Sequence, residues 1–337
     1  MTVIGRLDYG LRVHAPAHEH AKPSPFLASD AVYCGDAREL LTKVEPDSVA
    51  LSFWSPPYFV GKSYERELTF EDWQALLRDV IAGHFAAIKP GGFLAINIAD
   101  ILAFPDPAMP RIQADNVATK RSKVTRADVL AAQAAHPDFN RYQLAALLGT
   151  SEQTVDRRLK DNNIRGGKYE VQRKVKLVGG FIQEWGDAAG FHLYDRRAWV
   201  KDPAWENSRW HSLSYRSVDE FEYVYVFWKP GITTIDRNRL ARKEWAEWGS
   251  RGVWQIPSVR SNESHEAQFP TELARRVIRL LSGEDDLVLD PFLGSGTTAL
   301  AAIEQDRHFL GFELMPEYAA LARRNVHNAQ AQMRLPR

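Results

Sequence analysis

The segment Ser55-Pro56-Pro57-Tyr58 combines residue types that can grip a flat ring carrying an amine. It follows the apolar run 49–54, which predicts a buried strand. Two consecutive prolines end that strand and stiffen the residues that follow. A polar side chain and a backbone carbonyl are then held at the strand tip as acceptors, with an aromatic ring beside them for stacking. Taken alone, these residues also fit a proline turn with a buried tyrosine.

A second motif lies at 287–298, where an apolar strand ends in Asp290 and a loop of small residues leads into a helix. Glycines let a backbone approach a ligand closely, and the start of a helix offers free N–H groups. A further strand ends in Glu313, 23 positions after Asp290, near the spacing at which an acid reaches ribose hydroxyls. The dinucleotide pattern G-x-G-x-x-G is incomplete at Ala299, and no G-K-S/T follows the glycines. The motif predicts a nucleoside-bearing cofactor other than a dinucleotide, with a tight glycine turn as the alternative.

These two motifs, in this order, resemble those of DNA methyltransferases that modify exocyclic amino groups. Such enzymes use S-adenosylmethionine to make N6-methyladenine or N4-methylcytosine. A catalytic motif that precedes the cofactor motif resembles the beta group, in which the motif order is circularly permuted. Further similar segments are Y-C-G-D-A at 33–37, K-P-G-G-F-L-A-I-N-I at 89–98, E-Y-V-Y-V-F-W-K at 222–229 and H-E-A-Q-F-P-T-E-L at 265–273. The resemblance covers roughly residues 29–105 and 177–325.

The resemblance implies a role for each residue of the S-P-P-Y segment. The lone pair of a base amine is delocalised into the ring, and acceptors aimed at its N–H bonds localise that pair. Ser55 and the Pro56 carbonyl are expected to be these acceptors. Pro57 stiffens the segment together with Pro56, and Tyr58 is expected to stack on the base. The base must be flipped out of the duplex, at a cost of about a few kcal/mol. Lys62, just beyond, is expected to line the pocket or touch phosphate, although a solvated loop suits it equally.

The resemblance also implies the cofactor site. The positions that match the family's cofactor motifs are Asp36, His265, Phe269, Pro270, Asp290, Pro291, Phe292, Gly294, Ser295, Gly296, Thr297, Thr298 and Glu313. The sulfonium leaving group of the methyl donor is already activated, and no metal is therefore required.

The single cysteine, Cys34, excludes a neighbouring chemistry. Methylation at cytosine C5 needs a cysteine nucleophile, which that family carries in a Pro-Cys pair, whereas Cys34 follows Tyr33. We expect Cys34 to be a small buried residue at a strand end. One cysteine also excludes disulfides within the chain and a cysteine-rich zinc site. The ten histidines show no convincing ligand spacing.

Length and composition favour a cytoplasmic enzyme. The 337 residues can bury a large core, with room for one large domain and a smaller one. The sequence has no secretory signal and no apolar run long enough to span a membrane. Residues 1–28 are rich in Pro, His and Ala and show no clear period, and they are predicted to form an N-terminal arm or a dimer contact. Relatives in the beta group are often homodimers, and the resemblance implies a homodimer here.

Charge is distributed unevenly although the net charge is zero. Residues 111–176 carry 14 Lys and Arg against 7 Asp and Glu, and the remainder carries 29 against 36. A basic module that meets phosphate is the favoured interpretation, with a solvated insertion as the alternative. We therefore predict a DNA-recognition insertion at 106–176, set within a methyltransferase domain formed by 29–105 and 177–337.

The insertion resembles a helix-turn-helix. A helix capped by Thr125 is expected first; then one helix ends at Gly149 and Ser151 caps the next. In such motifs the start of the second helix enters the major groove. The base-edge candidates are Gln153, Thr154 and Arg157, with Arg158 and Lys160 expected on phosphate. A helical hairpin that packs on the catalytic domain is the alternative. The tryptophan-rich segment 230–262 could share the recognition of bases, and its residues suit a packed loop equally.

The predicted fold is a doubly wound α/β sheet, mostly parallel, with the strand order of methyltransferases permuted. Seven strands are expected, near 31–34, 49–53, 93–98, 195–200, 223–228, 287–290 and 308–313.

The favoured function is site-specific methylation of an exocyclic amine in double-stranded DNA. A catalytically inactive DNA-binding regulator on the same scaffold is the alternative, and the intact motifs argue against it. An RNA or protein substrate is a third possibility, which the helix-turn-helix disfavours. Within the family, Ser at position 55 leans towards cytosine N4, but either amine can donate to it, so the target base stays open.

Overall fold

The computed structural model of the protein describes residues 24–59, 69–104, 106, 108–109, 111–112, 122–160, 170–171, 174–204, 215–259 and 269–333. Lys62 and His265, which the sequence singled out, lie outside the described residues. So does most of the N-terminal arm, of which only 24–28 is described.

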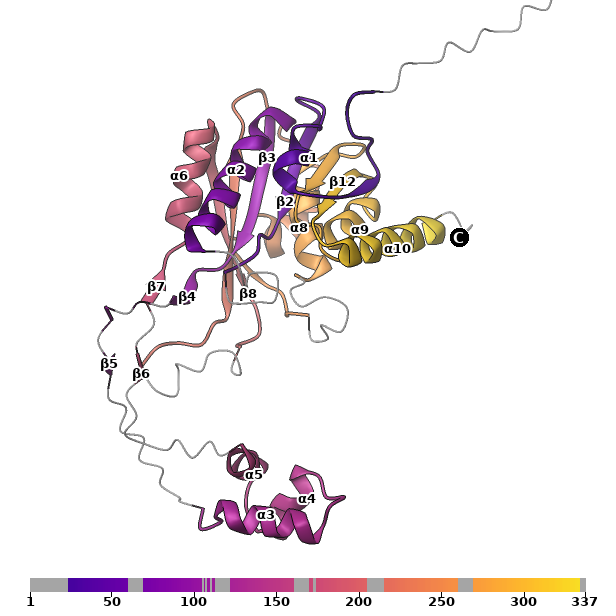
Figure 1. Ribbon diagram of the computed structural model, residues 1–337. Helices are drawn as coiled ribbons and strands as arrows, with labels where there is room; N and C mark the ends of the chain where they lie inside the picture. The colour runs from indigo at the N-terminus through magenta and orange to yellow at the C-terminus, as the bar shows by residue number, and fades with distance from the viewer. Residues whose placement is uncertain are drawn as a thin grey trace, which may run out of the picture.

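An eight-stranded sheet forms the centre of the molecule (Figure 1). Its order is β1 (Ala31–Cys34), β12 (His308–Glu313), β11 (Leu287–Asp290), β2 (Val49–Trp54), β3 (Ile88–Ile98), β9 (Phe221–Trp228), β8 (His192–Val200) and β10 (Val253–Gln255). The first five strands are parallel, whereas β9 runs antiparallel to both of its neighbours and β10 pairs with β8 in parallel. The mostly parallel α/β fold is confirmed.

The predicted count of seven strands is wrong by one, because β10 was not foreseen. Three residues are too few to show a strand period, and β10 lies in a stretch interpreted as a DNA-contacting or packed loop. Trp254 is its buried residue, and the indole N–H donates to the Trp248 carbonyl at 2.8 Å. This packing favours the packed-loop interpretation of the segment 230–262.

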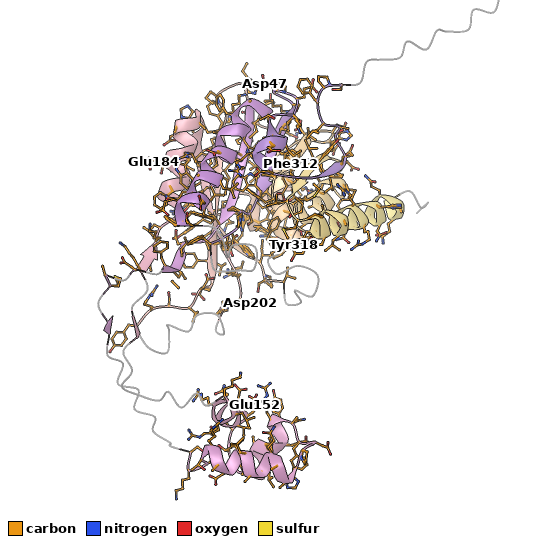
Figure 2. All side chains as sticks on the ribbon, viewed as in Figure 1. Asp47, Glu152, Glu184, Asp202, Phe312 and Tyr318 are labelled. Atoms are coloured by element: carbon orange, nitrogen blue, oxygen red, sulfur yellow. The ribbon has the colours of Figure 1, made fainter. Side chains whose placement is uncertain are left out.

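Helices cover both faces of the sheet. On one face lie α1 (Ala37–Leu41), α2 (Phe70–Ala87) and α6 (Gly179–Ala189), which share a hydrophobic core with β2 and β3. On the other face lie α8 (Thr271–Leu281), α9 (Thr297–Ile303) and α10 (Pro316–Met333). The short helix α7 (Arg242–Glu244) and the π-helix η3 (Trp245–Gly249) lie on the same face. Figure 2 shows side chains filling this layered unit, with Phe312 of β12 inside it. Two helical layers around one parallel sheet define a doubly wound fold.

Sequence spacing explains why α8 packs as it does. Its buried residues are Leu273, Ala274, Val277 and Ile278, which recur at helical spacing and form one apolar face. The arginines of the same helix lie on the opposite face.

The chain changes direction between β2 and β11. From β2 it passes through α2 to β3 on one side, and from β11 it passes through α9 to β12 on the other. The two strands are neighbours, with Leu289 beside Ser52. Ligands of doubly wound sheets bind outside the carboxyl ends of the strands at such a switch point. Both motifs found in the sequence follow these two strand ends.

A small helical unit interrupts the chain between β3 and α6. It contains α3 (Arg126–Ala135), α4 (Arg141–Leu147) and α5 (Glu152–Leu159), around a core of Val129, Ala132, Leu144, Ala145 and Val155. Thr125 and Ser151 accept hydrogen bonds from the first turns of α3 and α5, as predicted. Two short antiparallel pairs flank the unit: β4 (Ile101–Phe104) with β7 (Lys174–Lys176), and β5 (Arg111–Ile112) with β6 (Glu170–Val171).

Cys34 is exposed, so the prediction of a buried cysteine is wrong. The side chain lies at the end of β1, an edge strand, and its Sγ donates a hydrogen bond to the Leu314 carbonyl at 3.7 Å.

Candidate active site

Ser55 lies directly after β2 and is held by Asn97 of β3. The Ser55 hydroxyl donates to the Asn97 carbonyl at 2.9 Å, and Asn97 Nδ2 donates to Ser55 Oγ at 2.8 Å. Pro56 is buried, and the Pro57 carbonyl accepts a bond from the indole of Trp73 in α2 at 2.6 Å. These bonds to β3 and α2 hold the S-P-P-Y segment in place. Ser55 is half-buried, and its hydroxyl has a defined orientation.

Tyr58 is anchored by its hydroxyl. This group donates to Glu222 Oε2 at 2.6 Å and lies 2.9 Å from Ser55 Oγ. Burial raises the pKa of the Tyr58 hydroxyl well above its ordinary value, and the neighbouring Glu222 carboxylate raises it further. The ring is only half-buried, so the polar end is fixed while part of the ring stays open.

The loop after β11 is organised by Asp290. One carboxylate oxygen accepts from the Thr298 hydroxyl at 2.6 Å, and the other accepts from the Phe292 N–H at 2.9 Å. Gly294 and Gly296 have φ values of 56° and 101°, a region that favours glycine. Asp290 is buried, and burial raises its pKa to about 7 despite these two hydrogen bonds.

Glu313 closes the other side of the same loop. Its carboxylate accepts from the N–H groups of Gly294 and Met315, both at 2.8 Å. Burial raises the pKa of this carboxyl group as well. Asp36, at the end of the neighbouring strand β1, caps α1 and forms a two-pronged contact with Arg38, which lowers the pKa of Asp36.

Aromatic contacts join the catalytic and the cofactor segments. Trp54, the last residue of β2, meets Phe292 of the glycine loop edge-on, with ring centroids 5.3 Å apart. Phe269 packs on Phe53 of β2 at 5.2 Å, and Pro270 caps the start of α8. Among the described residues, the predicted cofactor positions and S-P-P-Y therefore lie along the carboxyl ends of the neighbouring strands β1, β12, β11 and β2 and at the start of α8.

Three polar residues of this site were not predicted. Asn97 and Glu222 are buried beneath Ser55 and Tyr58, and Lys201 pairs with Glu222 at 2.6 Å. A signal was present, because Asn97 interrupts the apolar stretch F-L-A-I-N-I and Glu222 begins the apolar stretch Y-V-Y-V-F-W. A polar residue inside a buried strand needs a partner, and here the partners are catalytic-loop side chains.

Comparisons with known proteins agree with this geometry. A family model described as DNA methylase matches residues 49–324. The chain belongs to the DNA methylase family. It is 57% identical over 301 residues to Type II methyltransferase M.BglI of Bacillus subtilis, covering 89% of this chain and 86% of that protein. It is also 26% identical to Type II beta methyltransferase M.BslI of Bacillus sp. (strain NEB-606), over 86% of this chain and 26% of that protein.

Solved structures share the fold of this methylase. A putative DNA modification methylase of Thermus thermophilus, TTHA0409, crystallised with S-adenosyl-L-methionine, matches with a TM-score of 0.57 and 25% identity, over 89% of this chain and 93% of the other. The cytosine-N4-specific PvuII DNA methyltransferase matches with a TM-score of 0.54 and 20% identity, over 93% and 95%. This methylase is a site-specific DNA methyltransferase that uses S-adenosylmethionine and acts on adenine N6 or cytosine N4. The matches favour the active enzyme over an inactive regulator.

The residues of the methylase that are predicted to contact DNA differ in exposure. Gln153 and Arg157 are exposed on α5, and Lys160 is exposed directly after it. Thr154 is buried and its hydroxyl lies 3.0 Å from that of Ser151, because this position faces the core of the helical unit. Arg158 donates to the Val124 carbonyl at 2.9 Å. The helical unit therefore presents Gln153 and Arg157, but not Thr154, on its surface.

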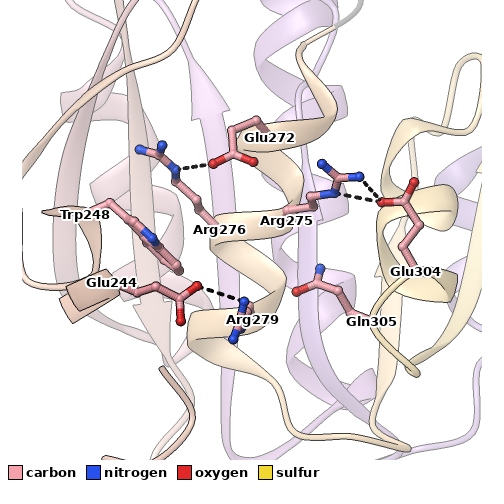
Figure 3. A pocket seen from close by; sticks show the side chains of 8 residues that line it. All are labelled: Glu244, Trp248, Glu272, Arg275, Arg276, Arg279, Glu304 and Gln305. Atoms are coloured by element: carbon pink, nitrogen blue, oxygen red, sulfur yellow. Dashed lines mark hydrogen bonds and ion pairs between the residues drawn. The ribbon is translucent and has the colours of Figure 1, made fainter. Parts of the chain in front are cut away.

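One cavity of the methylase, of about 390 Å³, lies away from this chemistry (Figure 3). Gln305 lines the cavity and precedes β12, so the cavity lies towards the amino ends of the strands, whereas Ser55 and Asp290 lie at the carboxyl ends. Its three arginines are each paired with a glutamate, namely Arg276 with Glu272, Arg275 with Glu304 and Arg279 with Glu244, at 2.7–2.8 Å. The charges are balanced, and the cavity has no part in the site described above.

Within the described residues, no group of three or more His, Cys, Asp or Glu side chains is arranged to hold a metal ion. Over the same ranges, no helix is long and apolar enough to cross a membrane.

Proposed function

We propose that Ser55 Oγ and the Pro56 carbonyl accept the N–H bonds of the target amine and localise its lone pair. The observation that carries this proposal is the position of S-P-P-Y at the switch point, beside the glycine loop and joined to it by the contact between Trp54 and Phe292. Orientation of the reacting groups then supplies a large part of the rate.

The residues around the glycine loop fit a positively charged nucleoside. Two carboxyl groups, Asp290 and Glu313, line the loop, and Gly294 and Gly296 leave its backbone without side chains. S-adenosylmethionine, when bound, supplies an electrophilic methyl group to the amine. Asp290 and Glu313 complement the positive charge of the donor, and Phe292 orients it beside Trp54.

Tyr58 is proposed to stack on the target base after that base leaves the duplex. Its hydroxyl is fixed by Glu222, and the ring is half-buried, which leaves a face for stacking. Stacking of a base on an aromatic side chain contributes about 1–3 kcal/mol. Tyr58 would thereby offset part of the cost of flipping.

The helical unit is proposed to recognise the DNA sequence through α5. Gln153 is exposed in its first turn and Arg157 in its last turn, and these residue types pair with adenine and guanine edges in the major groove. Lys160 and Arg158, near the end of the same helix, are proposed to contact phosphate. The homodimer expected from the family resemblance and the cytoplasmic location expected from length and composition remain part of this proposal.

The test is methyl transfer from labelled S-adenosylmethionine to unmethylated duplex DNA, with the modified nucleoside identified by mass spectrometry. The wild type is expected to produce N4-methylcytosine or N6-methyladenine, which also identifies the target base. Ser55→Ala is expected to lower the single-turnover rate by roughly 10²–10³-fold, in line with loss of a preorganised hydrogen-bonding group. Binding of S-adenosylmethionine should be unchanged.

Ser48→Ala is the matched control, because Ser48 precedes β2 and its hydroxyl donates only to the Glu45 carbonyl among the described residues. An unchanged rate in Ser55→Ala would contradict the proposed role of Ser55. Sedimentation of the free protein and of its DNA complex would test the homodimer separately.

A further inference from the structure

A chain of buried polar groups runs beneath the catalytic loop. Asn97 Nδ2 donates to Glu222 Oε2 at 2.7 Å, and Lys201 Nζ donates to Glu222 Oε1 at 2.6 Å. Lys201 also reaches Asp219 at 3.3 Å. Burial of so many polar groups is costly unless each is hydrogen-bonded, and a satisfied network fixes one arrangement.

The Asn97 amide has a definite orientation. Its NH₂ group must face the Glu222 carboxylate, since a carbonyl oxygen at 2.7 Å from a carboxylate oxygen would repel it. The second N–H is then directed to Ser55 Oγ at 2.8 Å and Tyr58 OH at 2.9 Å. Asn97 Oδ1 is buried without a partner among the described residues. The network thus directs the side-chain NH₂ of Asn97 to Ser55 and Tyr58, and it leaves the side-chain oxygen Oδ1 without a hydrogen bond among the described residues.

The hydroxyl of Ser55 has one proton and two lone pairs. The proton is donated to the main-chain carbonyl of Asn97, and one lone pair accepts a hydrogen bond from the side-chain NH₂ of Asn97. The second lone pair faces a competitor, because the Tyr58 hydroxyl lies only 2.9 Å away. If Tyr58 donated to Ser55, that lone pair would be unavailable to a target amine.

Glu222 decides this competition. A hydrogen bond from a hydroxyl to a carboxylate is shorter and stronger than one to another hydroxyl, and Tyr58 lies 2.6 Å from Glu222 Oε2. Lys201 lies 2.6 Å from the other oxygen of this carboxylate, and Glu222 and Asp219 raise the pKa of Lys201 despite its burial, so a cation stands beside Glu222. The Tyr58 proton is thereby directed to Glu222.

We propose that Glu222 is a positioning residue that draws the Tyr58 hydroxyl proton away from Ser55 and so leaves a Ser55 lone pair free for the target amine. The proposal rests on the acceptor role proposed for Ser55. It gives a buried ion pair of Glu222 and Lys201 a function in orienting protons, without contact with the substrate.

The decisive variant is Glu222→Leu. Leucine offers no acceptor to Tyr58 and no donor that would oppose the Asn97 NH₂ group, which stays on Ser55 because the side where Asn97 Oδ1 lies has no partner for it among the described residues. The Tyr58 proton then turns to Ser55 Oγ at 2.9 Å, since the main-chain carbonyl of Asn97 is farther away, at 3.3 Å, and already accepts from Ser55. The single-turnover rate of methyl transfer to duplex DNA is expected to fall by about 10- to 100-fold, the range for loss of a hydrogen bond to a charged group. The dissociation constant for S-adenosylmethionine should not change.

A double-mutant cycle with Tyr58→Phe separates this role from a purely structural one. Without the tyrosine proton, Glu222→Leu should cost at most about 3-fold beyond the loss caused by Tyr58→Phe itself. An equal cost in both backgrounds would overturn the proposal. Glu220→Gln, a half-buried acid in the approach to β9, is the control and should keep the wild-type rate.

If Glu222→Leu does not fold, Lys201→Met tests the same network from its far end. It should lower the rate in the wild-type background and much less in the Tyr58→Phe background. A loss that is independent of Tyr58 would again contradict the proposal. Failure of the proposed function is distinguishable, because it would appear as unchanged transfer in Ser55→Ala.

Discussion

The catalytic end of the sheet and the helical insertion use polar side chains in opposite ways. At the sheet, Asn97, Glu222, Asp290, Thr298 and Glu313 are all buried, and their hydrogen bonds connect neighbouring segments of the chain. In the insertion, the core is five apolar residues, and most charged groups are exposed. Methyl transfer needs groups that are oriented before the substrate arrives, whereas base recognition needs donors that remain free for base edges.

The charge distribution deepens this difference. Residues 122–160, which form the helical unit, carry six Lys and Arg against four Asp and Glu. The flanking stretches 111–121 and 161–176 carry eight against three, so most of the positive excess of the insertion lies beside the helices rather than on them. This distribution of charge fits the proposal that the helices read bases, and it extends the proposal to neutralisation of phosphate by the flanking stretches.

The strongest way to sharpen the comparison is to remove the exposed side chains of α5. The double variant Gln153→Ala, Arg157→Ala should lose about 2–6 kcal/mol of the free energy that distinguishes the recognition sequence from other DNA, because each good base contact contributes about 1–3 kcal/mol. The measurement is kcat/KM on duplexes with and without the recognition sequence. Binding of S-adenosylmethionine should stay unchanged.

Gln133→Ala, on the exposed face of α3, is the control for the first prediction. An equal loss on specific and nonspecific duplexes would show that α5 contributes charge rather than base recognition.

A second prediction tests whether the two regions are stabilised separately. Leu144→Ala removes a buried side chain from the small core of the insertion and should destabilise that unit by about 2–5 kcal/mol. DNA methylation should be lost, while the main unfolding transition and cofactor binding persist. Thermal unfolding followed with and without S-adenosylmethionine checks this, and exposed Leu147→Ala is the control. Loss of cofactor binding would contradict independent stability.

The same contrast explains what the sequence could predict. Motifs such as S-P-P-Y and G-S-G-T-T are local, and the strands, turns and caps around them follow from composition, as at Thr125 and Ser151. The pairing of Glu222 with Tyr58 joins residues 164 positions apart, which no local pattern reveals. Thr154 was misplaced because spacing on a helix does not say which face its neighbours cover. Strand β10 was missed because three residues carry no period.

The smallest expected effect concerns the cofactor half of the sheet. Burial raises the pKa of Asp290 to about 7, whereas the ordinary pKa of an aspartate is 3.8. Below pH 7 the protein without cofactor therefore holds a proton on Asp290. A cationic methyl donor favours the ionised carboxylate, and binding must therefore release that proton below pH 7. Affinity for S-adenosylmethionine should rise with pH, by about 10-fold between pH 6 and pH 8. Calorimetric titration across this range checks it, and Asp290→Asn, which cannot ionise, should bind more weakly but with a flatter pH profile. A slope that persists in Asp290→Asn would assign the proton to another group, such as Glu313, and would remove Asp290 from the buried groups that are tuned for the cofactor.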